Sequence, residues 1–226
     1  MRIAFFGGSF DPPHNGHLAV AEAARQALTL DQVLFAPVGL QPLKRDGSSA
    51  SFEDRVAMTR LAIAGEASFE ISLADAPNVA ELQKQPNYTI DTLLRLRRTL
   101  PANAELFLLL GADAFRLLRR WHRAAEIPFA ASLILASRPK EDLSDLVNLL
   151  PATLTSSLVS STPELNEFRL GNPAGDSAQL YLLPNLHYDI SATELRDEIN
   201  AGQAAPLSPL LPPAVLGYIH RHRLYI

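Results

Sequence analysis

Apolar residues along this chain fall into short uninterrupted runs that alternate with longer amphipathic or alanine-rich segments. The short runs predict buried strands, because strands that are apolar throughout belong to parallel sheets covered on both faces. The predicted strands are residues 2–6, 32–37, 69–73, 105–110, 132–136 and 179–183. The predicted helices are residues 17–28, 52–64, 88–99, 191–200 and 212–222. This alternation predicts an α/β fold with a doubly wound, mostly parallel sheet.

The pattern weakens between about residues 141 and 180. We expect a helix to about residue 150 and then irregular structure to about residue 176, because Ser, Thr, Pro and Asn are frequent there and periodicity is poor. No clear domain boundary is visible along the chain. The sequence therefore predicts a single domain over residues 1–226, with a less regular segment at about 141–180.

Composition narrows the class of protein. The 226 residues are 47% hydrophobic and 19% charged, which is ordinary for a globular protein. The net charge of −4 and the absence of a basic block argue against nucleic-acid binding. The chain has no cysteine, no signal-peptide pattern and no apolar run of about 18 residues, the length of a membrane span. We therefore expect a cytoplasmic protein that acts on small molecules, away from membranes.

The stretch between the first predicted strand and helix is G-G-S-F-D-P-P-H-N-G-H, residues 7–17. It is neither a Walker A loop nor a dinucleotide fingerprint, because no Gly-Lys-Ser/Thr follows and the glycines are wrongly spaced. Its parts suit a phosphate group: glycines permit close approach, a helix N-terminus attracts anions, and His14 and His17 can donate hydrogen bonds. An ordinary turn or a partial metal site would use the same residue types, although a metal would need a third ligand.

A second stretch, I-S-A-T-E-L-R over residues 190–196, opens a later predicted helix. Ser191 with Glu194 three residues on is a capping box. Arg196 lies in the first turns, where the positive end of the helix repels a cation. An anion held between the helix amides and the guanidinium would remove that conflict, and neighbouring acidic side chains could do so too.

Together, these two stretches resemble the paired signatures of the nucleotidylyltransferase superfamily. Further stretches, Y-T-I-D-T-L at 88–93, L-G-A-D at 110–113, Trp121-His122 and Arg138-Pro139, resemble those of bacterial nicotinate-mononucleotide adenylyltransferases. The resemblance implies a Rossmann-like sheet and adenylyl transfer from ATP to nicotinate mononucleotide. The products would be nicotinate adenine dinucleotide and pyrophosphate, in a step of NAD biosynthesis. Three departures are Ser9, where Thr is commoner, Ala192, where a second Ser is usual, and Q-P-L-K at 41–44, where Pro-x-His-Lys is frequent.

The resemblance also implies roles for individual residues. It implies that His17, His14, Arg196 and Lys44 carry catalysis, with His17 at the α-phosphate. The implied ATP-binding residues are Gly8, Ser9, Phe10, His14, His17, Gly111, Asp113, Ser191, Thr193 and Arg196. The implied nicotinate-mononucleotide-binding residues are Thr89, Trp121, His122, Lys44 and Arg138. Mg²⁺ is expected on the ATP phosphates rather than in a site fixed by the protein, and the chain is expected to be a monomer or weak homo-oligomer.

Three other interpretations stay open at this point. A phosphopantetheine adenylyltransferase has the same fold but is usually much shorter and lacks the Tyr-Thr-Ile-Asp and Trp-centred stretches. A non-catalytic nucleotide sensor would not need His14, His17 and Arg196 together. An interaction module could use the polar segment at 151–178 as its surface.

Overall fold

The computed structural model describes residues 1–43, 47–77, 86–137, 148–184, 186, 190–202 and 209–226. The chain divides into two compact units, which are described separately below. The first unit comprises Met1–Phe6, Val20–Val33 and Tyr88–His187, and the second comprises Gly7–Ala19, Leu34–Asn87 and Tyr188–Ile226. The two units are groups of residues that contact one another, and they do not by themselves define separate domains. The single domain expected over residues 1–226 therefore stays a prediction.

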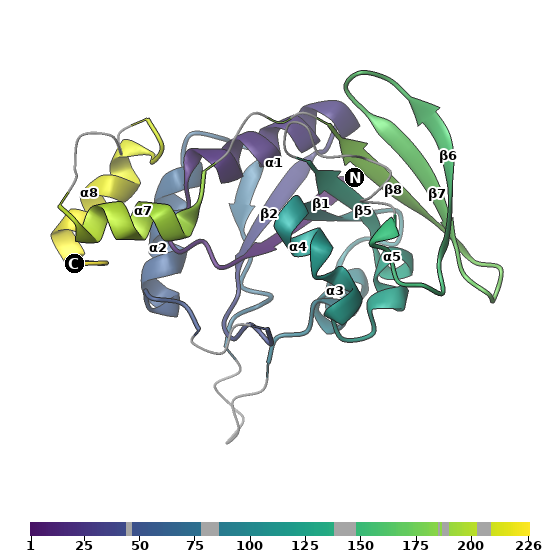
Figure 1. Cartoon of the computed structure of the whole chain (residues 1–226), viewed down its shortest axis with the longest axis horizontal. Helices are drawn as coiled ribbons and strands as arrows, with labels where there is room; N and C mark the ends of the chain where they lie inside the picture. Colours follow the sequence, from purple (N-terminus) through teal and green to yellow (C-terminus); the bar gives the residue numbers. More distant parts are fainter. Residues whose placement is uncertain (44–46, 78–85, 138–147, 185, 187–189, 203–208) are drawn as a thin grey trace. The chain divides into compact units, whose positions relative to one another are not determined.

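The first unit is built around parallel strands (Figure 1). Its parallel pairs join β1 to β4, β4 to β5 and β5 to β8. These strands are β1 (Arg2–Gly8), β4 (Glu105–Gly111), β5 (Ser132–Ala136) and β8 (Ser177–Leu183). The centres of β1, β4 and β5 are fully buried, as their unbroken apolar runs predict for strands covered on both faces. The prediction of a mostly parallel sheet is confirmed.

Helices and short turns connect the strands of the first unit. The helices are α3 (Thr89–Thr99), α4 (Ala112–Arg116) and α5 (Ile127–Ala130), together with the part of α1 (Asn15–Leu28) that follows Ala19; the start of α1 belongs to the second unit. Two 3₁₀ turns, η1 (Leu118–Arg120) and η2 (Ala124–Glu126), lie between α4 and α5. Pro101 follows the end of α3, as a residue that cannot continue a helix.

The segment expected to be irregular is instead an antiparallel extension of the sheet. β6 (Thr155–Ser161) pairs with β7 (Asn166–Gly171), and β7 pairs with β8. The prediction of irregular structure over 151–176 was therefore wrong. Every residue of β6 is exposed, so its sequence T-S-S-L-V-S-S has no apolar face to give a periodic signal. The helix predicted to end at about residue 150 lies mostly outside the described residues.

The second unit contains β2 (Gln32–Pro37) and β3 (Phe69–Ile71), which are neighbours, together with three helices. These helices are α2 (Phe52–Ile63), α7 (Ala192–Asn200) and α8 (Pro213–His222). Their buried residues form one apolar cluster: Ala50, Met58, Leu195, Ile199, Leu211, Val215 and Ile219. Ser51 and Ser191 cap α2 and α7 by accepting hydrogen bonds from the third helical amide, as predicted.

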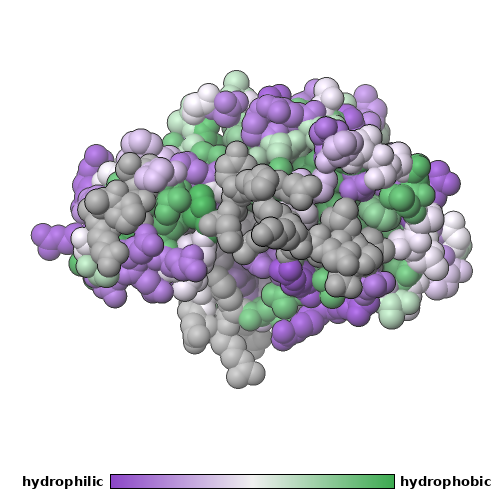
Figure 2. Space-filling view, turned by 45° about the horizontal axis from the view of Figure 1, so that its top comes forward, coloured by the Kyte–Doolittle hydropathy of each residue, from purple (hydrophilic) through white to green (hydrophobic). Residues whose placement is uncertain are grey.

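Among the described residues, no helix has both the length and the apolar character needed to cross a membrane. The face drawn in Figure 2 shows hydrophilic residues over much of its coloured surface, with hydrophobic residues in separate groups among them.

Candidate nucleotide-binding residues

The opening turn, residues 7–17, is packed around the side chain of Phe10. Phe10 adopts a left-handed conformation with φ of 47°, which is unusual for a bulky residue. Its ring is buried against the rings of His17 and Phe35, with centroids 5.0 and 5.6 Å away. A Cβ atom added to Gly8 would lie only 3.1 Å from this ring, so glycine permits the packing. The Phe10 side chain is therefore a packing element, and its predicted contact with ATP falls to the backbone.

His14 and His17 lie against each other at the start of α1. Their ring centroids are 3.7 Å apart, and the His14 amide donates to His17 Nδ1 at 3.2 Å. Because Nδ1 of His17 accepts, the neutral ring carries its proton on Nε2, a tautomer inferred from the hydrogen-bond network. Burial lowers the pKa of His14 to about 4. Burial, and then the neighbouring His14, lower the pKa of His17 well below its ordinary value. Both imidazoles are neutral donors at pH 7.

The two signature stretches meet within the second unit. A Cβ atom on Gly16 would lie 3.0 Å from His14 Nδ1 and 3.6 Å from the Ile190 side chain, so Gly16 allows this approach. His14 Nδ1 is buried and has no hydrogen-bond partner among the described residues. A buried polar atom without a partner is costly, and such atoms in native proteins require an explanation, of which a ligand is one.

Arg196 bridges α7 to the opening turn. Its Nη1 donates to the carbonyl oxygen of Asp11 at 2.7 Å and to that of Ala192 at 3.3 Å, and its Nη2 donates to Thr193 Oγ1 at 3.2 Å. All three acceptors are neutral oxygens, so these bonds orient the guanidinium while its positive charge still attracts an anion. Ser191 is engaged as the cap of α7, with Oγ accepting from the Glu194 amide at 3.4 Å.

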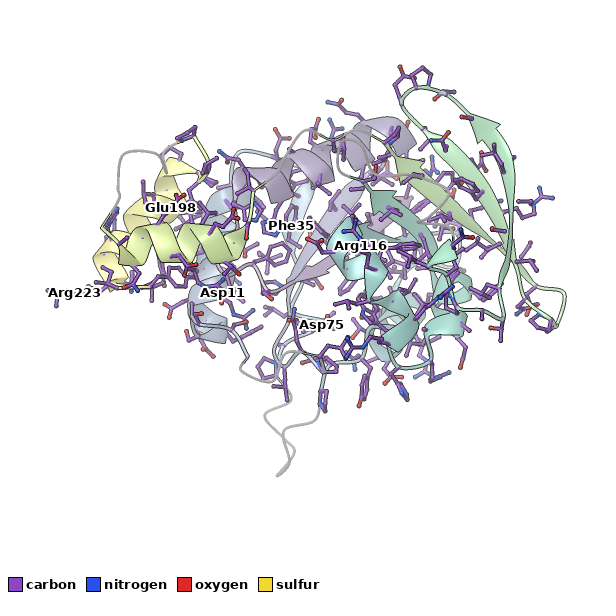
Figure 3. The ribbon with its side chains drawn as sticks, viewed as in Figure 1. Asp11, Phe35, Asp75, Arg116, Glu198 and Arg223 are labelled. Atoms are coloured by element: carbon purple, nitrogen blue, oxygen red, sulfur yellow. The ribbon has the colours of Figure 1, made fainter. Side chains whose placement is uncertain are left out.

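Two buried charged residues that the sequence interpretation missed hold the opening turn. The Asp11 carboxylate accepts hydrogen bonds from the amides of Ser49 and Ala50 and from the Tyr225 hydroxyl. Figure 3 labels Asp11 beside α7. The pairing of Asp11 with residues far along the chain leaves no signal in the local sequence.

The second buried charge is Arg55, whose side chain is 1% exposed. It donates to the carbonyls of Ser9 and Val38 at 2.7 and 2.8 Å. Burial lowers the pKa of the Arg55 guanidinium, and the Asp11 carboxylate acts in the opposite direction. A sequence signal did exist here, since Arg55 shares one helical face with the buried residues Met58 and Thr59.

The Trp121 stretch, residues 121–123, belongs to the first unit and is joined to the start of α3. The rings of Tyr88 and His122 lie with centroids 4.5 Å apart. Arg123 pairs with Asp91 at 3.5 Å and with Glu126 at 2.6 Å. Trp121 itself is half-buried, so part of the residue is accessible to solvent. Tyr88 and Asp91 therefore position this stretch.

Thr89, the predicted pocket residue, is the first residue of α3, and Tyr88 before it makes no side-chain capping hydrogen bond. The first amides of a helix have no acceptor within the helix itself. The start of α3 therefore presents donors suited to an anionic group such as a carboxylate.

The remaining predicted residues are less constrained. Gly111 precedes α4, and a Cβ atom added there would meet nothing within 4 Å, so space is open beside it. Asp113 is exposed and accepts from Arg116 at 3.2 Å. Lys44 and Arg138 lie outside the described residues. Within the described part of the chain, no group of three His, Cys, Asp or Glu side chains could hold a metal ion.

The chain is similar to known proteins in its family motifs, in its full-length sequence and in its fold. The model of the family described as cytidylyltransferase-like matches residues 5–198. A protein of Gloeobacter violaceus named probable nicotinate-nucleotide adenylyltransferase is 36% identical over 99% of this chain and 96% of its own. One of the same name from Trichlorobacter lovleyi is 35% identical over 100% of this chain and 99% of its own.

Solved structures share the fold. The nicotinic acid mononucleotide adenylyltransferase of Plasmodium falciparum, complexed with APC, has a TM-score of 0.70 at 17% identity and covers 99% of this chain and 96% of its own. The same enzyme complexed with NaAD has a TM-score of 0.68 at 18% identity. These similarities support the Rossmann-like nucleotidylyltransferase fold.

The chain belongs to the cytidylyltransferase-like family of nucleotidyltransferases. Within it, the full-length relatives group the chain with the bacterial nicotinate-nucleotide adenylyltransferases, as its motifs predicted. The alternative of a phosphopantetheine adenylyltransferase is not favoured.

Proposed function

We propose that this protein transfers the adenylyl group of ATP to nicotinate mononucleotide, releasing pyrophosphate and forming nicotinate adenine dinucleotide. The observation that carries the proposal is the 2.7 Å hydrogen bond from Arg196 to the Asp11 carbonyl, which joins two signature stretches 185 residues apart. It rests also on the full-length relatives named for this activity.

In this reaction a phosphate oxygen of the mononucleotide attacks the α-phosphorus of ATP while the bond to the β-phosphate breaks. Pyrophosphate leaves, and no covalent bond to the protein forms. Such a transfer depends on positioning and on stabilising the charge that develops on phosphate oxygens. We assign the latter to His17, whose Nε2 proton is fixed by the bond at Nδ1. His14 donates beside it.

We assign binding of the β- and γ-phosphates of ATP to the amides at the start of α7 and to Arg196. The three hydrogen bonds that orient Arg196 all go to neutral oxygens, so none of them neutralises its positive charge. This supports the role, because the charge can still attract a phosphate. Ser191 and Thr193 contribute from the same helix start, and Lys44 from its loop. Gly8 and Ser9 provide backbone contacts at the nucleotide.

We assign recognition of the nicotinate group to residues of the first unit. Trp121 stacks on the pyridine ring, while the amides near Thr89 and His122 donate to its carboxylate. Donors alone favour the acid over the amide, because an amide would turn its own N–H groups toward one of them. Arg138 contributes to binding the mononucleotide, and Gly111 and Asp113 contact the ATP ribose or a metal-bound phosphate.

Mg²⁺ would be held mainly by the phosphates and water, and would neutralise the polyphosphate. Outside the reaction itself, we expect a cytoplasmic monomer or weak homo-oligomer that binds no nucleic acid.

The test is a pyrophosphate-release assay with ATP, Mg²⁺ and one acceptor at a time, with the dinucleotide identified by mass. We expect rapid release with nicotinate mononucleotide and slow release with nicotinamide mononucleotide or 4′-phosphopantetheine. Binding of ATP without turnover of any acceptor would indicate a nucleotide sensor and contradict the proposal.

A further inference from the structure

We propose that Tyr225 is a positioning residue for ATP, acting through the buried Asp11 carboxylate on the opening turn. The inference rests on the proposed function, because ATP binding reports the position of the turn. Tyr225 was not among the residues that the motifs pointed to, and it lies 214 residues from Asp11 in the sequence.

Asp11 is the point at which several elements of the second unit meet. Its side chain is 2% exposed, and its carboxylate is held by three donors. Ser49 N donates to Oδ2 at 2.6 Å, Ala50 N donates to Oδ1 at 3.1 Å, and the Tyr225 hydroxyl donates to Oδ1 at 2.7 Å. A buried carboxylate needs such donors, because each one lost leaves charge poorly solvated. The hydroxyl is the donor that a single conservative substitution can remove.

The main chain of the same residue reaches the proposed phosphate ligand. The Asp11 carbonyl accepts from Arg196 Nη1 at 2.7 Å. A shift of the Asp11 carboxylate therefore moves the acceptor that orients Arg196. Tyr225 thus acts on one proposed ATP-binding group, Arg196.

The backbone after α8 is shaped to bring Tyr225 inward. Arg223 ends α8 in a left-handed conformation with φ of 51°, and Tyr225 itself has φ of 64°. Arg223 is exposed and points away from α8 in Figure 3, while the Tyr225 ring packs on the apolar cluster around Leu195. Left-handed conformations are unfavourable for such residues, so the packing and the Asp11 bond must hold them.

The state of the hydroxyl fits a permanent donor. Burial, followed by the charge of Asp11, raises the pKa of Tyr225 far above its usual value. The proton therefore stays on the phenol at any pH at which the protein works, and Asp11 accepts it in a hydrogen bond.

Tyr218 on α8 supplies a matched control. Its hydroxyl also donates to a carboxylate, Asp54 Oδ1 at 2.9 Å, and its ring packs on the same apolar cluster. Asp54 lies in the first turn of α2 and is no part of the opening turn. Tyr218→Phe and Tyr225→Phe therefore remove the same chemical group from two tyrosines that pack on one apolar cluster, and only the Tyr225 hydroxyl donates to the opening turn.

The experiment measures steady-state kinetics, melting temperature and calorimetric binding of a non-hydrolysable α,β-methylene ATP for both variants. We expect Tyr225→Phe to raise KM for ATP and Kd for the analogue by about fivefold to tenfold, as for one lost hydrogen bond to a charged group. The turnover number and KM for nicotinate mononucleotide should stay within about twofold. Tyr218→Phe should lower the melting temperature without changing either ATP constant.

A second variant, Asp11→Asn, changes the acceptor of the Tyr225–Asp11 hydrogen bond instead of its donor. Because it weakens the acceptor, adding Tyr225→Phe to Asp11→Asn should raise KM for ATP less than it does in the native protein. Unchanged ATP constants in Tyr225→Phe, or an equal rise in Tyr218→Phe, would overturn the positioning role. If the native protein binds the analogue but does not adenylylate nicotinate mononucleotide, the proposed function fails, and the binding constants still decide the role of Tyr225.

Discussion

The opening turn in the second unit and the Trp121 stretch in the first unit both carry predicted ligand-binding residues, but they are held in different ways. The opening turn is fixed by hydrogen bonds that Asp11 accepts and that Arg55 and Arg196 donate, all of them buried or part-buried. The Trp121 stretch is fixed by Arg123, whose ion pairs with Asp91 and Glu126 are exposed and therefore weak.

This difference matches the demands of the proposed reaction. Groups that stabilise charge at phosphorus must be placed accurately before the substrate arrives, because reorganisation during the reaction would cost rate. A ring-stacking surface tolerates more movement, since its attraction is broad and weakly directional. The comparison predicts that loss of a phosphate donor carried by the turn, such as His17, reduces turnover, whereas changes in the Trp121 stretch alter binding of the mononucleotide.

The largest expected effect is at His17. His17→Ala removes the donor proposed for the α-phosphate, and we expect the turnover number to fall about 10²-fold or more, with a smaller change in KM for ATP. The measurement is steady-state kinetics on protein whose circular dichroism matches the native chain. Near-native turnover in the folded variant would show that the turn has no transition-state role.

A second effect separates substrate choice from turnover. The one buried donor that faces the carboxamide NH₂ is left unpaired at a cost of about 1–3 kcal/mol, which predicts a kcat/KM up to about 10²-fold higher for nicotinate mononucleotide than for nicotinamide mononucleotide. Trp121→Ala should raise KM for both, because stacking does not distinguish acid from amide. Equal kcat/KM values for the two mononucleotides would mean that the Trp121 stretch has been given the wrong ligand.

A smaller effect is expected at Arg196. Arg196→Ala should raise KM for ATP about tenfold, as for a lost charged hydrogen bond. It should also lower stability modestly, because the Asp11 carbonyl loses a donor. Ser191→Ala serves as the comparison, since losing a helix cap costs about 1 kcal/mol of stability. If Arg196→Ala lowers only the melting temperature and leaves ATP kinetics intact, the guanidinium is purely structural.

The smallest effect concerns pH. Burial lowers the pKa of His14 from 6.5 to about 4 in the folded chain, so the unfolded chain binds more protons between these values. Stability should therefore fall as pH decreases from 6.5 toward 4, and His17 acts in the same direction. His14→Gln should flatten the curve of melting temperature against pH over that window. A curve that stays as steep in His14→Gln as in the native protein would argue against burial of His14 as the cause.

Local signals in the sequence predicted most of the fold. Ser51 and Ser191 mark helix starts because a short hydroxyl side chain suits the cap position, and both are found there. The buried parallel strands were predicted because they are apolar throughout. The exposed strand β6 was missed, because its pairing with β7 depends on a partner strand rather than on its own pattern.

The candidate site was predicted unevenly for a related reason. His14, His17 and Arg196 belong to motifs whose chemistry is visible in a few residues, and the structure brings them into the second unit together. Tyr225 and Asp11 form a contact between distant positions, which no local pattern encodes. The ligand roles of all these residues remain predictions, as do those of Lys44 and Arg138.

The separation of Asp11 and Tyr225 also has a consequence for synthesis of the chain. A ribosome adds about 5–20 residues per second, so the 214 residues between them take about 10–40 s to make. Throughout that interval the Asp11 carboxylate lacks the Tyr225 hydroxyl as a donor. The proposed positioning of the opening turn by Tyr225 therefore begins only after the segment that follows α8 has left the ribosome.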